Sequence, residues 1–144
     1  MTPLVRDAAP GDLPAVRALV AAAGLPLDGH DDAAVVLVAE AGGAVVGTVA
    51  LERHGEPPVL LLRSAAVDAA HRGTGVGTAL TRTALQRAAG APIALLTTTA
   101  DGYYPRFGFR AVDRTSLPPA LGASAELRGA CPATAVAMLR DATA

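Results

Sequence analysis

Residues 67–80 read VDAAHRGTGVGTAL: the end of an apolar run, a glycine-rich turn and the start of a helical pattern. Val59 to Val67 predicts a buried strand, and Thr78 to Ala89 repeats apolar residues at helical spacing. Three glycines in the turn allow close approach to the backbone, and amides at a helix start favour an anion. The segment therefore predicts a phosphate-binding turn, with a pyrophosphate as its natural guest and Arg72 adding positive charge.

The rest of the chain predicts strands and helices in alternation around this turn. The predicted strands are Leu4–Asp7, Val35–Glu40, Ala44–Glu52, Val59–Val67, Pro92–Thr98, Phe109–Asp113 and Thr134–Arg140. The predicted helices are one that follows Asp12 and ends before Gly24, one at Thr78–Ala89 and a short one at Asp101–Phe107. Residues 25–33 predict a loop that is irregular or partly helical and covers a cleft. A right-handed crossover makes the fourth and fifth strands parallel, within a mixed, mostly antiparallel α/β sheet.

Composition limits what such a domain can do. The 144 residues are 51% hydrophobic and 17% charged, which predicts one globular domain over residues 1–144. A net charge of −1 argues against a nucleic-acid partner. All 12 basic residues are arginine, so Schiff-base chemistry and the lysine of a P-loop are excluded.

Other sequence features concern location and metals. The lone Cys131, the lack of a secretion signal and the short apolar runs predict a cytoplasmic protein with no membrane span. Cys131 itself is expected to be a small buried residue rather than a nucleophile. His30, His54 and His71 lie far apart in sequence, so we expect them on surface turns and predict no metal site.

Three phosphate-binding patterns compete for the turn. A dinucleotide-binding fingerprint needs GxGxxG and an acid about 20 residues on, and a P-loop needs lysine, so neither fits. Arg72 to Gly77 instead fits Arg/Gln-x-x-Gly-x-Gly/Ala after a strand, and here the chain resembles the GNAT family of N-acetyltransferases. The resemblance implies a splayed fourth and fifth strand pair and binding of acetyl-CoA by Ala66, Val67, Arg72, Gly73, Thr74, Gly75, Val76, Gly77 and Thr78.

A second match is YPRFGF at residues 104–109, which looks like the Tyr-x-x-x-Gly-Phe element of the same family. By this resemblance Tyr104 is the candidate catalytic residue, because a phenol beside the thioester sulfur can protonate the thiolate as it leaves. The alternative is that Tyr103, Tyr104, Phe107 and Phe109 simply form an aromatic core.

The chain is most similar within that family to small arsenic-resistance N-acetyltransferases and to short N-acetylglutamate-synthase-like enzymes, through segments LRSAAV, LLTTT and AELRGACPATA. The resemblance implies a small amino-acid-like amine as acceptor and is compatible with a homodimer. Arg63, Ser64 and Thr98 are the candidate substrate-binding residues. Arg63 also stands out by itself, since an arginine within an apolar run must face solvent or a polar pocket. A substrate carboxylate would satisfy it, and so would a structural partner.

No general base follows from the resemblance, because Leu61 occupies the position of the glutamate found in many relatives. Glu40, Glu52 and Glu126 are expected to be solvated charges rather than bases. A water relay or capture of a neutral amine stays open. Two other functions are weighed against transfer to a small amine: acetylation of a protein or peptide amine, and non-catalytic sensing of acyl-CoA.

Overall fold

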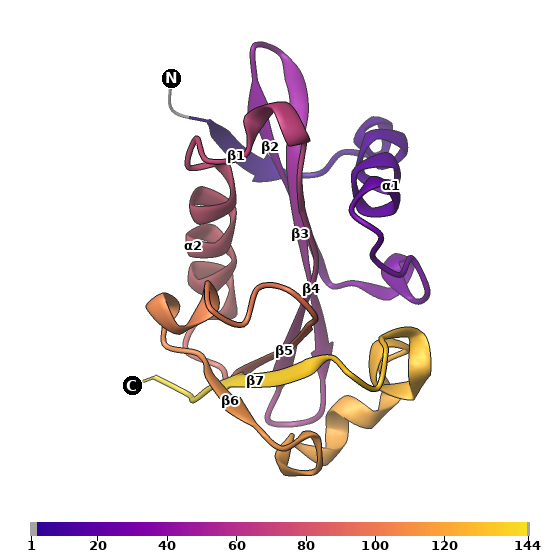
Figure 1. Cartoon of the computed structure of the whole chain (residues 1–144), viewed down its shortest axis with the longest axis vertical. Helices are drawn as coiled ribbons and strands as arrows, with labels where there is room; N and C mark the ends of the chain where they lie inside the picture. The colour runs from indigo at the N-terminus through magenta and orange to yellow at the C-terminus, as the bar shows by residue number, and fades with distance from the viewer. Residues whose placement is uncertain (1–2, 144) are drawn as a thin grey trace.

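The computed structural model describes residues 3–143, so residues 1, 2 and 144 of the predicted domain lie outside the described part. Seven strands form one mixed sheet in the order β1-β2-β3-β4-β5-β7-β6 (Figure 1). The strands are β1 Leu4–Asp7, β2 Val35–Ala41, β3 Ala44–His54, β4 Val59–Val67, β5 Ile93–Thr97, β6 Arg110–Val112 and β7 Val136–Arg140. All seven predicted strands are present, with ends shifted by at most two residues.

The one parallel pair in this sheet joins β4 to β5, and each of the other neighbouring pairs is antiparallel. The crossover between β4 and β5 is helix α2, Val76–Ala88, which lies on the opposite face of the sheet from α1, Leu13–Ala22 (Figure 1). The predicted mixed α/β fold with a parallel fourth and fifth strand is therefore confirmed.

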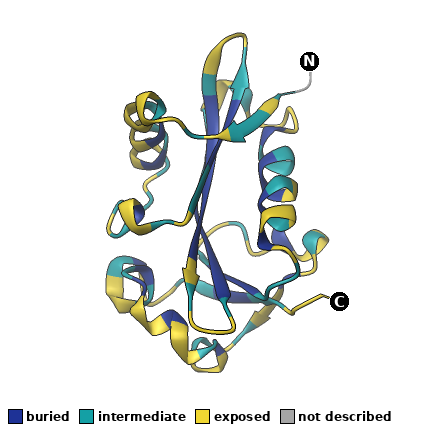
Figure 2. Ribbon diagram, turned by 180° about the vertical axis from the view of Figure 1, so that it is seen from behind, coloured by how far each residue is buried: buried dark blue, intermediate teal, exposed yellow. Residues whose placement is uncertain are grey.

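Side chains of β4 alternate between two hydrophobic cores, as the two-residue period of a strand requires. Leu60 and Leu62 face the core under α2, while Val59 and Leu61 face a second core that includes Leu121. Strands β3 and β4 are buried along most of their length (Figure 2). The odd-numbered residues of β4 from Val59 to Arg63 thus lie on the face away from α2.

Helix α2 rests directly on the backbone of β3 at Gly47. A Cβ atom at Gly47 would lie 2.8 Å from Cγ1 of Val76 and 2.9 Å from Cδ1 of Leu80. Real Cβ atoms do not approach so closely, so this glycine sets the distance between helix and sheet. That distance fixes where the glycine-rich turn lies relative to β4.

A β-bulge and a divergence of strands open the middle of the sheet. Ala50 pairs with Arg63 and Thr48 with Ala66, so Ser64 and Ala65 together face Val49, and Ser64 has a left-handed backbone with φ 56°. The β4–β5 pairing covers Leu60 with Ile93 and Leu61 with Ala94 only. Beyond these pairs the two strands separate, as the splayed pair implied by the family resemblance requires.

The helical segments depart further from expectation than the strands. Helix α2 begins at Val76, two residues before the predicted start, because Gly75 supplies a left-handed N-cap with φ 90°. The predicted 101–107 helix is a single 3₁₀ turn, η4 Tyr104–Phe107. The predicted loops contain further short turns, namely η1 Pro10–Asp12, η2 His30–Asp32, η3 Ala69–His71, η5 Arg114–Ser116, η6 Pro119–Ala123 and η7 Glu126–Ala130. Among residues 3–143, no helix has the length and apolar character to cross a membrane.

Candidate functional site

The first cavity lies between the glycine-rich turn, the start of α2 and the end of β4, and has a volume of about 560 Å³. Most of the predicted acetyl-CoA-binding residues line it, namely Ala66, Val67, Arg72, Gly73, Gly75, Gly77 and Thr78. Two do not. The Thr74 hydroxyl instead bonds the carbonyl of His71, and the Val76 side chain is buried against β3.

Glycine serves two different purposes in this turn. Gly73 and Gly75 have φ values of 77° and 90°, a conformation that other residues adopt at a cost, and both Cβ positions face open space. Gly77 has an ordinary helical backbone, and a Cβ there would lie 3.7 Å from the Tyr103 hydroxyl. Its missing side chain leaves the cavity wall as bare backbone, which a ligand can approach closely.

Charge in this cavity is positive. Arg72 lines it and donates from Nε to the carbonyl of Val67 at 3.3 Å. Arg106, which the sequence analysis did not identify, lines it too, with its guanidinium 4.6 Å from the centre of the Tyr103 ring. The described lining residues include no carboxylate. Together with the amides at the start of α2, the two arginines give this cavity a surface that suits an anion.

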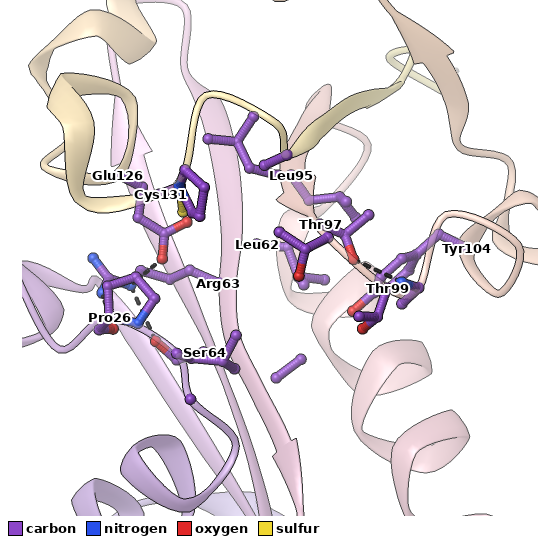
Figure 3. A pocket seen from close by; sticks show the side chains of 18 residues that line it. Pro26, Leu62, Arg63, Ser64, Leu95, Thr97, Thr99, Tyr104, Glu126 and Cys131 are labelled. Carbon is purple, nitrogen blue, oxygen red and sulfur yellow. Dashed lines mark hydrogen bonds and ion pairs between the residues drawn. The ribbon is translucent and has the colours of Figure 1, made fainter.

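The second cavity, of about 170 Å³, lies where β4 and β5 have separated. The three predicted substrate residues, Arg63, Ser64 and Thr98, all line it. The other walls come from distant segments: residues 24–26 after α1, residues 95–100 at the end of β5, and residues 126–135 (Figure 3). Hydroxyl groups of three consecutive threonines, 97–99, and the Glu126 carboxyl give it a polar lining.

Arg63 is held inside a dense set of hydrogen bonds. Its side chain is fully buried, and its Nη1 donates to Glu52 at 2.7 Å and to the carbonyl of Asp28 at 2.8 Å. Its Nη2 donates to the carbonyl of Pro26 at 3.1 Å, and its Nε lies 3.1 Å from the Ser64 hydroxyl and 3.2 Å from Glu126. Of the five N–H groups, one on Nη2 has no acceptor among the described residues.

This pairing bears on the two alternatives that the sequence left open for Arg63. A bidentate bond to a substrate carboxylate needs two available N–H groups, and the arrangement leaves one. Arg63 is instead a buried, paired arginine that shapes the cavity wall and ties the loop before η2 to the sheet. A role in binding substrate through that one N–H stays a prediction.

The expectation of solvated carboxylates is wrong for two of the three glutamates. Glu40 is half-buried and bonded to Arg6, but Glu52 and Glu126 are each 3% exposed. Burial acts to raise the pKa of Glu52, yet hydrogen bonds from Arg63, His54 and Ser124 hold it below its usual value. Burial raises the pKa of Glu126. The positive charge of Arg63 lowers it, but by less, so the pKa stays above its usual value. This burial was not predictable from the sequence, because the segments that cover the two glutamates are far apart in the chain.

Tyr104 lies where the two cavities meet. It lines both, together with Ala65 and Ala100. Burial, and to a lesser extent Tyr103, raise the pKa of Tyr104 to about 12, so its phenol is protonated at neutral pH. Within residues 3–143 its hydroxyl makes no hydrogen bond, whereas the Tyr103 hydroxyl lies 3.2 Å from that of Thr78. A donor is thus available at the junction.

The aromatic residues also form the cluster that the alternative reading predicted. The ring of Tyr104 packs edge-on against Tyr103 at 5.2 Å and Phe109 at 5.6 Å, and Tyr103 packs against Phe107 at 5.3 Å. Packing and a functional hydroxyl do not exclude each other, since the rings fix the direction in which the phenol points.

Cys131 and His30 are both buried, which governs how each side chain ionises. Burial and the neighbouring Glu126 raise the pKa of Cys131 to about 12, which makes a thiolate nucleophile unfavourable. Contrary to expectation, His30 is buried, 4% exposed, and burial lowers its pKa. In the described part of the chain no three His, Cys, Asp or Glu side chains come together as metal ligands.

The chain matches the family model described as "Acetyltransferase (GNAT) domain" over residues 32–111. It is 51% identical over 53 residues to mouse N-acetyltransferase 8, a match that covers 34% of this chain and 23% of the mouse protein.

Solved structures share the fold over all or most of the chain. A Neisseria gonorrhoeae N-acetylglutamate synthase complexed with coenzyme A and N-acetyl-glutamate superposes with a TM-score of 0.83 at 19% identity, over 100% of this chain and 36% of that one. A GNAT-family acetyltransferase from Brucella melitensis in complex with acetyl-CoA gives a TM-score of 0.61 at 28% identity, over 76% of this chain and 84% of that one. The chain thus spans about a third of the synthase and a quarter of the mouse protein.

Proposed function

This chain belongs to the GNAT acetyltransferase family, and we propose that it transfers the acetyl group of acetyl-CoA to the primary amine of a small amino-acid-like molecule. In this reaction acetyl-CoA supplies an activated acyl carbon and a thiol leaving group. The remaining steps fall to the residues around the two cavities.

The first cavity fits acetyl-CoA by its chemistry. Gly73 and Gly75 leave open space over the backbone at the start of α2, and Arg72 and Arg106 supply two positive charges. Such a surface suits a pyrophosphate. The edge of β4 at Ala66 and Val67 has no strand partner on the β5 side and lies beside this cavity, where an extended pantetheine arm would run like an added strand. Coenzyme A or acetyl-CoA is present in the Neisseria and Brucella relatives.

The position of Tyr104 is the observation that carries the proposal. Its phenol stands between a cavity suited to a phosphate-bearing ligand and a smaller polar cavity, which is where a reacting thioester would meet an amine. With a pKa near 12 the phenol holds its proton at neutral pH and can give it to a departing thiolate.

The second cavity supports a small acceptor. Its 170 Å³ lies below the roughly 300–1,000 Å³ of pockets that take drug-sized ligands, so an amino acid suits it better than a peptide. Amine-bearing organoarsenicals, the substrates suggested by resemblance to arsenic-resistance enzymes, fall in the same size class. A single catalytic domain and a cytoplasmic location are also predicted from the sequence, and a homodimer is compatible with the family resemblance.

The test is release of coenzyme A thiol, measured with acetyl-CoA and a panel of amino acids, amine-bearing organoarsenicals and short peptides. We expect turnover with one of the small amines and a matching acetylated product by mass spectrometry. Turnover with peptides alone would favour a protein acetyltransferase. Tight acetyl-CoA binding by calorimetry with no turnover on any amine would favour an acyl-CoA sensor.

A further inference from the structure

In many relatives a glutamate general base occupies the position of Leu61. In this chain the position is apolar and does not face the second cavity, which we call the acceptor cavity. Leu61 is fully buried and packs with Val59 and Leu121 on the face of the sheet away from α2. An acceptor amine enters as an ammonium ion at neutral pH, and the nitrogen must lose a proton before it can attack. The proton therefore needs another acceptor.

Glu126 is the carboxylate that the structure offers. It comes from η7, 65 residues further along the chain than Leu61, and in the described part of the chain no other carboxylate lines the acceptor cavity. Its side chain extends from η7 toward Arg63, on the wall opposite Tyr104 (Figure 3). Its carboxyl lies 3.2 Å from the Arg63 Nε, and its backbone N–H donates a hydrogen bond to the Ser124 hydroxyl at 3.2 Å.

When Glu126 is ionised, the charges around it do not balance without a further cation. Arg63 on β4 lies between two buried carboxylates, Glu52 on β3 and Glu126 on η7. Glu52 receives hydrogen bonds from Arg63, His54 and Ser124 and is the stable partner of the arginine. The remaining titratable neighbour, the Cys131 thiol, carries no positive charge. A substrate ammonium ion would supply the missing charge.

We propose, resting on the function proposed above, that Glu126 binds the acceptor ammonium and takes its proton as the general base of acetyl transfer. Ionised Glu126 accepts one proton from the ammonium, which frees the nitrogen lone pair. The N–C bond then forms at the acetyl carbon as the C–S bond breaks. The departing sulfur gains a proton from Tyr104. The amine nitrogen loses its second proton, and Tyr104 is reprotonated. In total one proton is released to solvent per turnover.

Burial fits Glu126 for this task better than exposure would. A raised pKa makes its ionised form a stronger base than an ordinary glutamate, and general bases work best with a pKa near the working pH. The same burial shields the ammonium–carboxylate pair from water, which strengthens their attraction.

The decisive variant is Glu126→Gln, which keeps shape and hydrogen bonding but cannot accept a proton at its side chain. We expect kcat/KM at pH 7 to fall about 10²- to 10⁴-fold, the range of general acid–base catalysis, with acetyl-CoA affinity within about threefold of wild type. The loss should shrink as pH rises toward the pKa of the amine, because hydroxide then removes the proton. A purely structural glutamate would not shift the pH profile this way.

Glu40→Gln is the matched control, since Glu40 lies on β2 and bonds Arg6 outside both cavities. It should retain wild-type turnover and pH profile. Should Glu126→Gln fail to fold in a thermal melt, Glu126→Ala with added formate serves instead, and formate should restore turnover. A folded Glu126 variant with wild-type rate and pH profile would overturn the inference. A wild-type protein that acetylates no amine would overturn the proposed function itself.

Discussion

The two cavities are built in opposite ways. The wall of the first comes mainly from one continuous stretch, residues 65–81, whose backbone and glycines provide the binding surface. The wall of the second is made by side chains from segments as far apart as Pro26, Arg63 and Glu126. We infer that binding of acetyl-CoA depends on local backbone shape, whereas choice of acceptor depends on tertiary packing. Four tests, each built on one or two substitutions, separate these two dependences.

The largest effect is expected at Tyr104, which belongs to both cavities. Tyr104→Phe should lower kcat and kcat/KM together by about 10²- to 10⁴-fold, since the phenol acts only as the thiolate departs. Acetyl-CoA affinity should stay within about threefold. Single-turnover rates measured by thiol release give the result, and a thermal melt checks that the ring cluster with Phe109 survives. Rates within threefold of wild type would leave Tyr104 a packing residue.

Next in size is the ion pair beneath the acceptor cavity. Glu52→Gln removes the 2.7 Å partner of the buried Arg63 and should lower the free energy of unfolding by about 3–5 kcal/mol at neutral pH. The folded pKa of Glu52 is lowered, so its stabilising effect is full above the unfolded value near 4.5 and is lost as pH falls through the folded pKa. Urea titrations of both proteins at several pH values should therefore converge in acid. A difference in the free energy of unfolding that stays the same at every pH would contradict this prediction.

A third substitution acts on the first cavity alone. Gly75→Asp should weaken coenzyme A binding at least tenfold in calorimetry, because it strains a residue with φ 90° and brings negative charge to an anion site. Gly75→Asn imposes a similar backbone cost without the charge. The affinity difference between the two variants measures the electrostatic part, and equal affinities would show that no anion binds at this turn.

The smallest effects distinguish a glycine required by the fold from one required by the cavity. Gly77→Ala meets only ordinary contacts, so stability should rise by up to about 1 kcal/mol while coenzyme A affinity falls a few-fold. Gly47→Ala would force its Cβ to within 3 Å of Val76 and Leu80 and should cost about 1–3 kcal/mol. Thermal melts and calorimetry on both variants give the comparison. A destabilised Gly77→Ala with intact affinity would reverse these assignments.

The contrast between the cavities also explains what the sequence could predict. Local patterns predict the strands, the turn between β4 and α2 and the parallel pairing of β4 with β5. The structure confirms these elements, with some of their ends shifted. The burial of Glu52 and Glu126 was not predictable, because the segments that cover them are brought there only by the folded chain. His30 was misjudged for the same reason. Arg106 carries a weak local signal, three residues after the tyrosine that it covers.

The divergence of β4 and β5 places two sheet edges in the middle of the molecule. Unpaired strand edges invite hydrogen bonding by other chains, and proteins commonly protect them with bulges or cover them. Here the bulge at Ser64 and Ala65 bends one edge, and the Tyr104 cluster and the η7 turn flank the opening. An extended ligand that enters this opening can hydrogen-bond to the unpaired edge of β4 as an added strand would. The same unpaired edge is thus both a place that the fold must protect and a place where an amide-bearing ligand can bind.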